Sequence, residues 1–118
     1  MGMFNQVTVP EAIYCPMCGE DRSGWFVQFY YGDLILQDYE LGQDLFWDME
    51  WEWIGHPSIP GVWAQGVLLG CPVCHFHFDD PHDEFYIVEI RHNRIVGVIK
   101  DESGYGWWAE DWVAVPDR

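Results

Sequence analysis

Basic side chains are scarce in this sequence of 118 residues. Five Lys or Arg stand against 20 Asp or Glu, which gives a formal net charge of −15. Proteins that bind nucleic acid through its phosphates, or bind anionic membrane surfaces, do so with Lys and Arg. We therefore expect no direct contact with nucleic acid and none with a membrane.

The few basic residues are also unevenly placed. The stretch from Ser23 to Ile90 contains no Lys or Arg, yet it holds twelve Asp or Glu. A large part of the surface must then be negative without ion pairs inside that stretch. Two interpretations remain open: the charge maintains solubility through self-repulsion, or it steers the protein toward a basic partner.

Several other features are missing. No apolar run approaches the ~20 residues of a membrane helix. Residues 1–10 lack the basic start and apolar stretch of a secretory leader, which favours a cytoplasmic protein. There is no glycine-rich phosphate loop, and Ser23, Ser58 and Ser103 lie in no nucleophile elbow. We expect one domain over residues 1–118, and not an enzyme.

Cysteine is limited to four residues, which form two Cys-x-x-Cys pairs. Each pair directs two sulfurs toward one point, and two pairs supply the complete tetrahedral shell that structural zinc prefers. Disulfide pairing and redox use remain alternatives, but a reducing cytosol favours metal binding. The predicted metal ligands are Cys15, Cys18, Cys71 and Cys74.

The residues around these cysteines, CPMCG at 15–19 and CPVC at 71–74, resemble the two knuckles of a zinc ribbon. The resemblance implies that one Zn²⁺ is clamped between two β-hairpin ends. Residues 19–70 separate the knuckles by more than a minimal ribbon needs, so we expect an additional antiparallel sheet there. His75 stands where many ribbons have glycine. The chain also looks like a rubredoxin in composition, which gives an iron–thiolate electron carrier as the alternative.

Alternating apolar and polar residues predict a mostly β fold. The pairs at 32–33 and 92–93 read as hairpin turns, and residues 55–61 read as a loop. Residues 107–115 fit a short helix or a strand equally well. The predicted strands are 25–31, 34–37, 46–54, 62–69, 85–91 and 94–100.

The segment 46–54 has the clearest alternation. As a strand it places tryptophans on one face and carboxylates on the other, a combination typical of protein interfaces. A second acidic segment follows at 79–83. From these we predict a surface that binds a basic protein, as an inhibitor or immunity-like protein whose carboxylates replace phosphates would do. The candidate residues are Asp48, Glu50, Trp51, Glu52, Trp53, Asp79, Asp80 and Asp83.

Three histidines follow the second knuckle. His75 and His77 would share a face of a strand, and with His82 they could bind a second metal ion. The alternative is an exposed polar turn, because the spacing matches no known catalytic metal motif. Charge repulsion disfavours large homo-oligomers, so we expect a monomer or a dimer.

Overall fold

The computed structural model describes residues 4–10, 15, 17–19, 25–47, 53–69, 71, 84–104 and 106–115. The fold is mostly β, as predicted, and the described residues include no α-helix. No helix in this part of the chain has the length and apolar character to cross a membrane. The strands are β1 (Asn5–Thr8), β2 (Phe26–Phe29), β3 (Gly32–Asp33), β4 (Asp38–Tyr39), β5 (Trp53–Ile54), β6 (Gly61–Leu68), β7 (Phe85–Arg91), β8 (Arg94–Lys100) and β9 (Trp112–Ala114).

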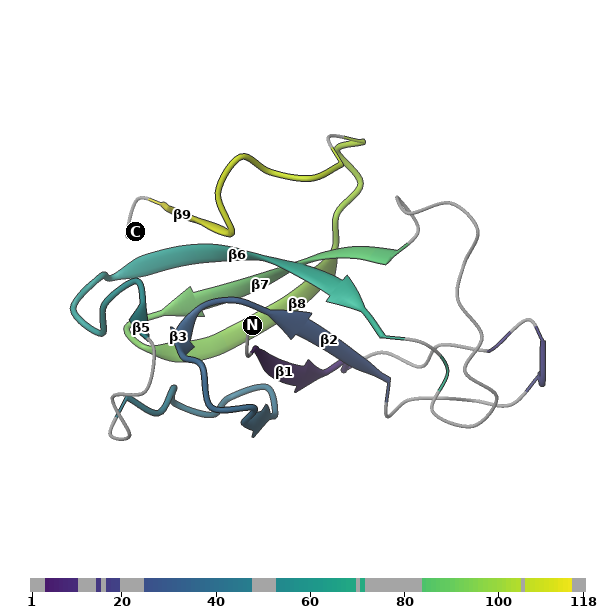
Figure 1. The fold of residues 1–118 in the computed structure, drawn as a ribbon, viewed down its shortest axis with the longest axis horizontal. Helices are drawn as coiled ribbons and strands as arrows, with labels where there is room; N and C mark the ends of the chain where they lie inside the picture. Colours follow the sequence, from purple (N-terminus) through teal and green to yellow (C-terminus); the bar gives the residue numbers. More distant parts are fainter. Residues whose placement is uncertain are drawn as a thin grey trace.

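One main sheet carries most of these strands. Its order is β4-β1-β2-β6-β7-β8, and β9 pairs with the first half of β6 (Figure 1). All pairs are antiparallel except β1 with β4, which is parallel. The strands β3 and β5 form a separate two-stranded antiparallel sheet. The predicted additional antiparallel sheet between the knuckles is confirmed in β3 and β5, whereas β2, β4 and β6 of the same region belong to the main sheet.

The predictions of β6, β7 and β8 are confirmed, with β6 displaced by one residue. The hairpin of β7 and β8 has the predicted bounds. Its turn residues His92 and Asn93 both have positive φ, 48° and 68°. Two consecutive positive φ values are those of the tight turn that matches the twist of paired strands.

Three predictions of local structure were wrong. Gly32–Asp33 is not a hairpin turn but the strand β3, and residues 34–37 form no strand. In the segment 46–54, the described residues 46 and 47 are not in a strand, whereas Trp53 and Ile54 form β5. Residues 112–114 of the ambiguous C-terminal segment form β9, because they find backbone partners on β6.

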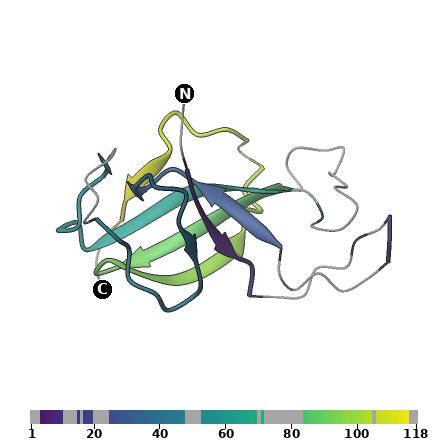
Figure 2. The ribbon, with the colours of Figure 1, turned by 60° about the horizontal axis from the view of Figure 1, so that its bottom comes forward.

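The main sheet is curled, and the segment that follows its end strand β4 is hydrogen-bonded to its other end strand, β8. Past β4, residues 42–45 run along β8 at the other end of the sheet (Figures 1 and 2). Gly42 N–H donates to Ile95 O at 2.7 Å, and Ile95 N–H donates to Gln43 O at 2.9 Å. Leu45 N–H donates to Asn93 O at 2.8 Å. The segment 42–45 thus closes the sheet around its core.

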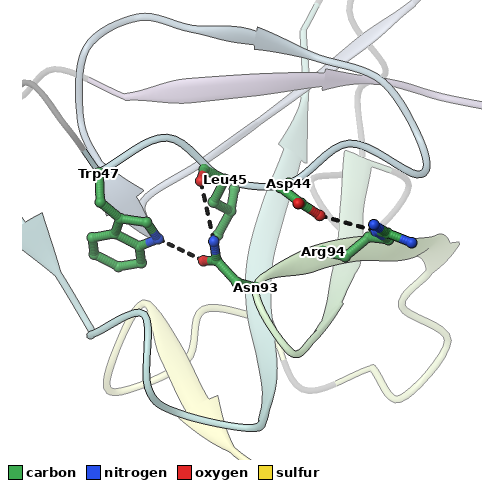
Figure 3. Close-up of polar contacts among 5 residues, drawn as sticks. All are labelled: Asp44, Leu45, Trp47, Asn93 and Arg94. Atoms are coloured by element: carbon green, nitrogen blue, oxygen red, sulfur yellow. Dashed lines mark hydrogen bonds and ion pairs between the residues drawn. The ribbon is translucent and has the colours of Figure 1, made fainter.

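Asn93 fixes this closing segment (Figure 3). Its amide Nδ2 donates to Leu45 O at 3.2 Å, and its Oδ1 accepts the indole N–H of Trp47 at 2.5 Å. An exposed ion pair joins Arg94 Nε to Asp44 Oδ1 at 2.9 Å. Because exposed pairs contribute roughly 0–1 kcal/mol, the Asn93 bonds and backbone bonds hold the segment.

The interior of the curled sheet is apolar. Its largest fully buried side chains include Trp25, Tyr31, Tyr39 and Phe29. Of the three described cysteines, Cys15 and Cys71 belong to the same core cluster. The core therefore extends to the place where the knuckles were predicted. Its other buried members are Val7, Val9, Val27, Leu45, Trp47, Val62, Ala64, Leu68, Val88, Ile90, Ile95 and Val98.

Candidate metal centre

The topology brings the described residues of the two predicted knuckles, 15, 17–19 and 71, to one end of the sheet. The strand β2 is antiparallel to both β1 and β6, so β1 and β6 run in the same direction (Figure 1). The pairing continues past the strands: Val9 N–H donates to Trp25 O at 2.8 Å, and Leu69 N–H donates to Phe26 O at 2.9 Å. The chain therefore leaves β1 and β6 at the same end of the sheet, and continues from there to Cys15 and to Cys71.

Three of the four predicted ligands lie together there. The sulfur atoms of Cys15, Cys18 and Cys71 are all within 4.8 Å of one another. The Cys18 and Cys71 sulfurs are 3.9 Å apart. Cys15 and Cys71 are buried, whereas Cys18 is exposed. Residues far apart in sequence thus contribute to one thiol cluster, as predicted. The fourth predicted ligand, Cys74, lies outside the described residues.

The backbone of the first knuckle turns around Cys15. The Cys18 N–H donates to the Cys15 sulfur at 3.5 Å, and the Gly19 N–H donates to the Cys15 carbonyl oxygen at 2.8 Å. Gly19 has a φ of 73°, a conformation that side chains with a Cβ rarely adopt. Gly19 therefore serves the turn of this knuckle, and the Cys18 N–H reaches the Cys15 sulfur.

These distances suit a metal ion better than a disulfide. Four sulfurs placed tetrahedrally at about 2.3 Å from Zn²⁺ are about 3.8 Å apart. The 3.9 Å between the Cys18 and Cys71 sulfurs is close to this value, and far from the roughly 2.05 Å of an S–S bond. An N–H donated to a sulfur also favours the thiolate form. The cluster could therefore hold a soft metal ion. The distances fit zinc and iron alike, since both accept thiolate ligands.

The other predicted site residues are mostly outside the described part of the chain. This applies to Asp48, Glu50, Trp51 and Glu52, to Asp79, Asp80 and Asp83, and to His75, His77 and His82.

Within the predicted aromatic face, Trp47 and Trp53 are described. Trp47 is only 7% exposed, and it packs edge-on against Trp53 with ring centroids 4.9 Å apart. The indole N–H of Trp53 donates to Trp47 O at 3.1 Å. Trp53 is 37% exposed, so it can contact a partner while Trp47 supports it from the core.

The sequence did not indicate a second feature, an aromatic cavity of about 450 Å³ beside β6. Three tryptophans line it, Trp63, Trp107 and Trp108, together with Asp101. Trp63 comes from β6, and the others come from the segment between β8 and β9. The signal was present in the adjacent Trp107 and Trp108, but their relation to Trp63 arises only from the sheet pairing.

Comparisons of the chain with protein-family models, curated proteins and solved structures gave no match. The resemblance to zinc ribbons therefore rests on the two cysteine motifs of the sequence alone.

Proposed function

We propose that this protein is a small metal-stabilised β domain that binds a basic protein through its acidic surface. The observation that carries the metal part is the cluster of three sulfurs within 4.8 Å, contributed from two distant segments. Four thiolates leave no position for water on the metal, so the role of the ion is structural. The fourth ligand in this proposal is Cys74.

Zinc is the ion that we favour, in a reducing compartment such as the cytoplasm, where thiols persist. Iron remains the second candidate, because a thiolate site accepts both ions. With iron, the protein would be an electron carrier whose acidic face docks a redox partner.

Native mass spectrometry and an absorption spectrum of the purified protein separate these ions. We expect one zinc per chain and no visible colour. Visible charge-transfer bands together with bound iron would establish the electron carrier. A metal-free chain with disulfides would contradict both.

The partner class follows from charge. A net charge of −15, with no Lys or Arg between Ser23 and Ile90, favours association with a positively charged surface. The exposed Trp53 and the neighbouring acidic segment 48–52 supply an aromatic anchor among carboxylates, the composition of an interface centre and its rim. An inhibitor that covers a nucleic-acid-binding surface satisfies both features.

A basic nuclease is a suitable probe for this part of the proposal. We expect the protein to inhibit it near a one-to-one ratio, with affinity that falls as salt rises. Polyglutamate of the same total charge is the control, because it reproduces the charge without the fold. Inhibition no stronger than that of polyglutamate, or affinity indifferent to salt, would contradict a specific acidic interface.

A further inference from the structure

One wall of the aromatic cavity beside β6 is the segment between β8 and β9, which is hydrogen-bonded to the sheet. Gln65 of β6 donates from Nε2 to Gly106 O at 2.8 Å, and its Oε1 accepts the backbone N–H of Trp108 at 3.1 Å. Gln65 is 6% exposed, so both bonds are shielded from water. In Figure 1 the chain from β8 to β9 arches above β6. Gln65 fixes this arch, and the cavity is preformed.

The walls of the cavity are aromatic and mostly apolar. Trp107 is 70% exposed and packs edge-on against Phe85, with ring centroids 4.8 Å apart. Trp63 lies opposite Val113 of β9 in the sheet register, and Val113 also lines the cavity. A volume of about 450 Å³ lies within the roughly 300–1,000 Å³ of small-ligand pockets. Indole faces attract cations through the ring quadrupole.

One carboxylate belongs to this wall. Asp101 is 7% exposed, and its Oδ1 accepts the backbone N–H of Ser103 at 3.0 Å. Burial raises the pKa of Asp101, but the hydrogen bonds from Ser103 and Trp108 and the charge of Lys100 lower it further, so the pKa lies below its ordinary value. At neutral pH the cavity therefore contains a negative charge among three indoles.

We propose that this cavity receives an arginine side chain. The guanidinium is planar and weakly hydrated, stacks on aromatic faces and pairs with carboxylates through a fork of donors. The lysine ammonium is more strongly hydrated and loses more on entering an apolar pocket. The inference rests on the proposed function in one respect: it takes the arginine to belong to the basic protein partner.

The test is an NMR titration that follows the indole N–H signals of Trp63, Trp107 and Trp108. The probe is N-acetyl-arginine amide. N-acetyl-citrulline amide, which has nearly the same shape without the charge, and N-acetyl-lysine amide are the matched comparisons. We expect saturable shifts with the arginine probe, and binding at least about tenfold weaker with the citrulline and lysine probes. Equal binding of arginine and citrulline, or no saturable shift, would overturn the proposal.

Two variants locate the binding. Asp101→Asn keeps an oxygen that can accept the Ser103 N–H, and we expect it to weaken arginine binding at least about tenfold. Trp107→Ala removes an exposed wall and should weaken it several-fold. Glu40→Gln, an exposed position on the loop after β4, removes the same charge and should leave binding unchanged. Equal effects of Asp101→Asn and Glu40→Gln would mean that only the net charge matters, which would contradict the proposed arginine site.

The same samples separate this proposal from the proposed function. If the nuclease is inhibited but binding of the arginine probe does not saturate, the proposed arginine site is contradicted and the proposed acidic interface is supported. If binding of the arginine probe saturates at the tryptophans but no basic protein binds, the arginine site is supported and the proposed class of partner is contradicted.

Discussion

Asn5 organises a whole stretch of chain with one side chain. It is fully buried in β1, and its Nδ2 donates to the carbonyl oxygens of Tyr31 and Asp33 at 3.0 Å each. Its Oδ1 accepts the N–H groups of Ile35 and Gln37 at 3.3 and 3.2 Å. The side-chain amide of Asn5 thus forms hydrogen bonds with four backbone groups between residues 31 and 37, so these four groups need no partner on another strand.

Replacing Asn5 by alanine should be among the most damaging single changes in the described structure. Leaving a buried polar group unsatisfied costs about 1–3 kcal/mol, and this variant affects several. We expect Asn5→Ala to lower the free energy of unfolding by at least about 3 kcal/mol in urea denaturation. The control is Gln6→Ala on the same strand, whose bond to Asp38 is exposed and should matter by less than about 1 kcal/mol. Equal losses would contradict this role of Asn5.

Asp101 gives a prediction about pH. Its pKa in the folded protein is lowered, so its ionised form stabilises the fold at all pH values above its ordinary pKa of 3.8. That contribution is lost as the pH falls through the lowered value. Wild type should therefore exceed Asp101→Asn in unfolding free energy at pH 7, and the difference should shrink toward pH 3. A difference that stays constant between these pH values would show that the charge of Asp101 is irrelevant to stability.

At the scale of the elements, Gly66 marks a close approach between strands of the main sheet. It lies on β6 opposite Phe29 of β2 and Tyr86 of β7. A Cβ built there would stand 2.2 Å from Cγ1 of Val27, a core side chain of β2. Only glycine allows β6 to lie this close to Val27.

Gly66→Ala should therefore destabilise the fold by about 1–3 kcal/mol, as overpacking does. Val27→Ala removes the clashing methyl groups and should destabilise the protein by itself through the cavity that it leaves. The double variant should lose less free energy of unfolding than the sum of the two single losses. Urea unfolding of all four proteins measures this. Strict additivity would show that the two positions do not meet.

The elements found from the sequence are those whose signal is local. The strands β6, β7 and β8 are runs of seven or eight residues rich in β-branched and aromatic residues, and the His92–Asn93 turn is encoded by its own residues. The strand β1 was missed because Asn5–Thr8 is short and its first residue is polar. The residues 32–37 were misassigned because their backbone partners include the Asn5 side chain, about thirty positions away, which no local pattern shows.

The same distinction applies to the candidate sites. That Cys15, Cys18 and Cys71 lie together was predictable, because two Cys-x-x-Cys pairs are a spacing that metal coordination requires. The aromatic cavity was not, since it needs Trp63, Trp107 and Asp101 to meet through the pairing of β6 with β7 and β9. A period-two pattern also could not predict that Trp53 is exposed and Trp47 is buried, because Trp47 is not part of a strand.

At the scale of the whole molecule, the thiol cluster joins the N-terminal segment to the middle of the chain. In our proposal a metal ion bound there closes the loop from Cys15 to Cys71, and its binding energy contributes to folding. Structural zinc in finger peptides contributes about 10–16 kcal/mol, which exceeds the roughly 5–15 kcal/mol net stability of a typical domain. Loss of the ion should therefore unfold much of the protein.

The variant Cys71→Ser tests this. We expect a loss of bound zinc, a Tm lower by at least about 15 °C, and no response of the variant to a strong zinc chelator. The same chelator should lower the Tm of the wild type, which controls for the substitution itself. A variant that melts like the wild type, or a wild type that ignores the chelator, would show that no metal supports the fold.

The segment 42–45, which closes the sheet, also bears on aggregation. An uncovered strand at the end of a sheet is a template on which a second molecule can add its own strand. The strand β8 has basic residues only at its ends, Arg94 and Lys100, and between them it reads Ile-Val-Gly-Val-Ile, with Val96 and Ile99 exposed. If the Asn93 bonds fail, residues 42–45 can leave β8 while the rest of the fold persists. Self-association would then begin from a nearly native molecule, on a strand whose own side chains include no carboxylate, although the protein carries a net charge of −15.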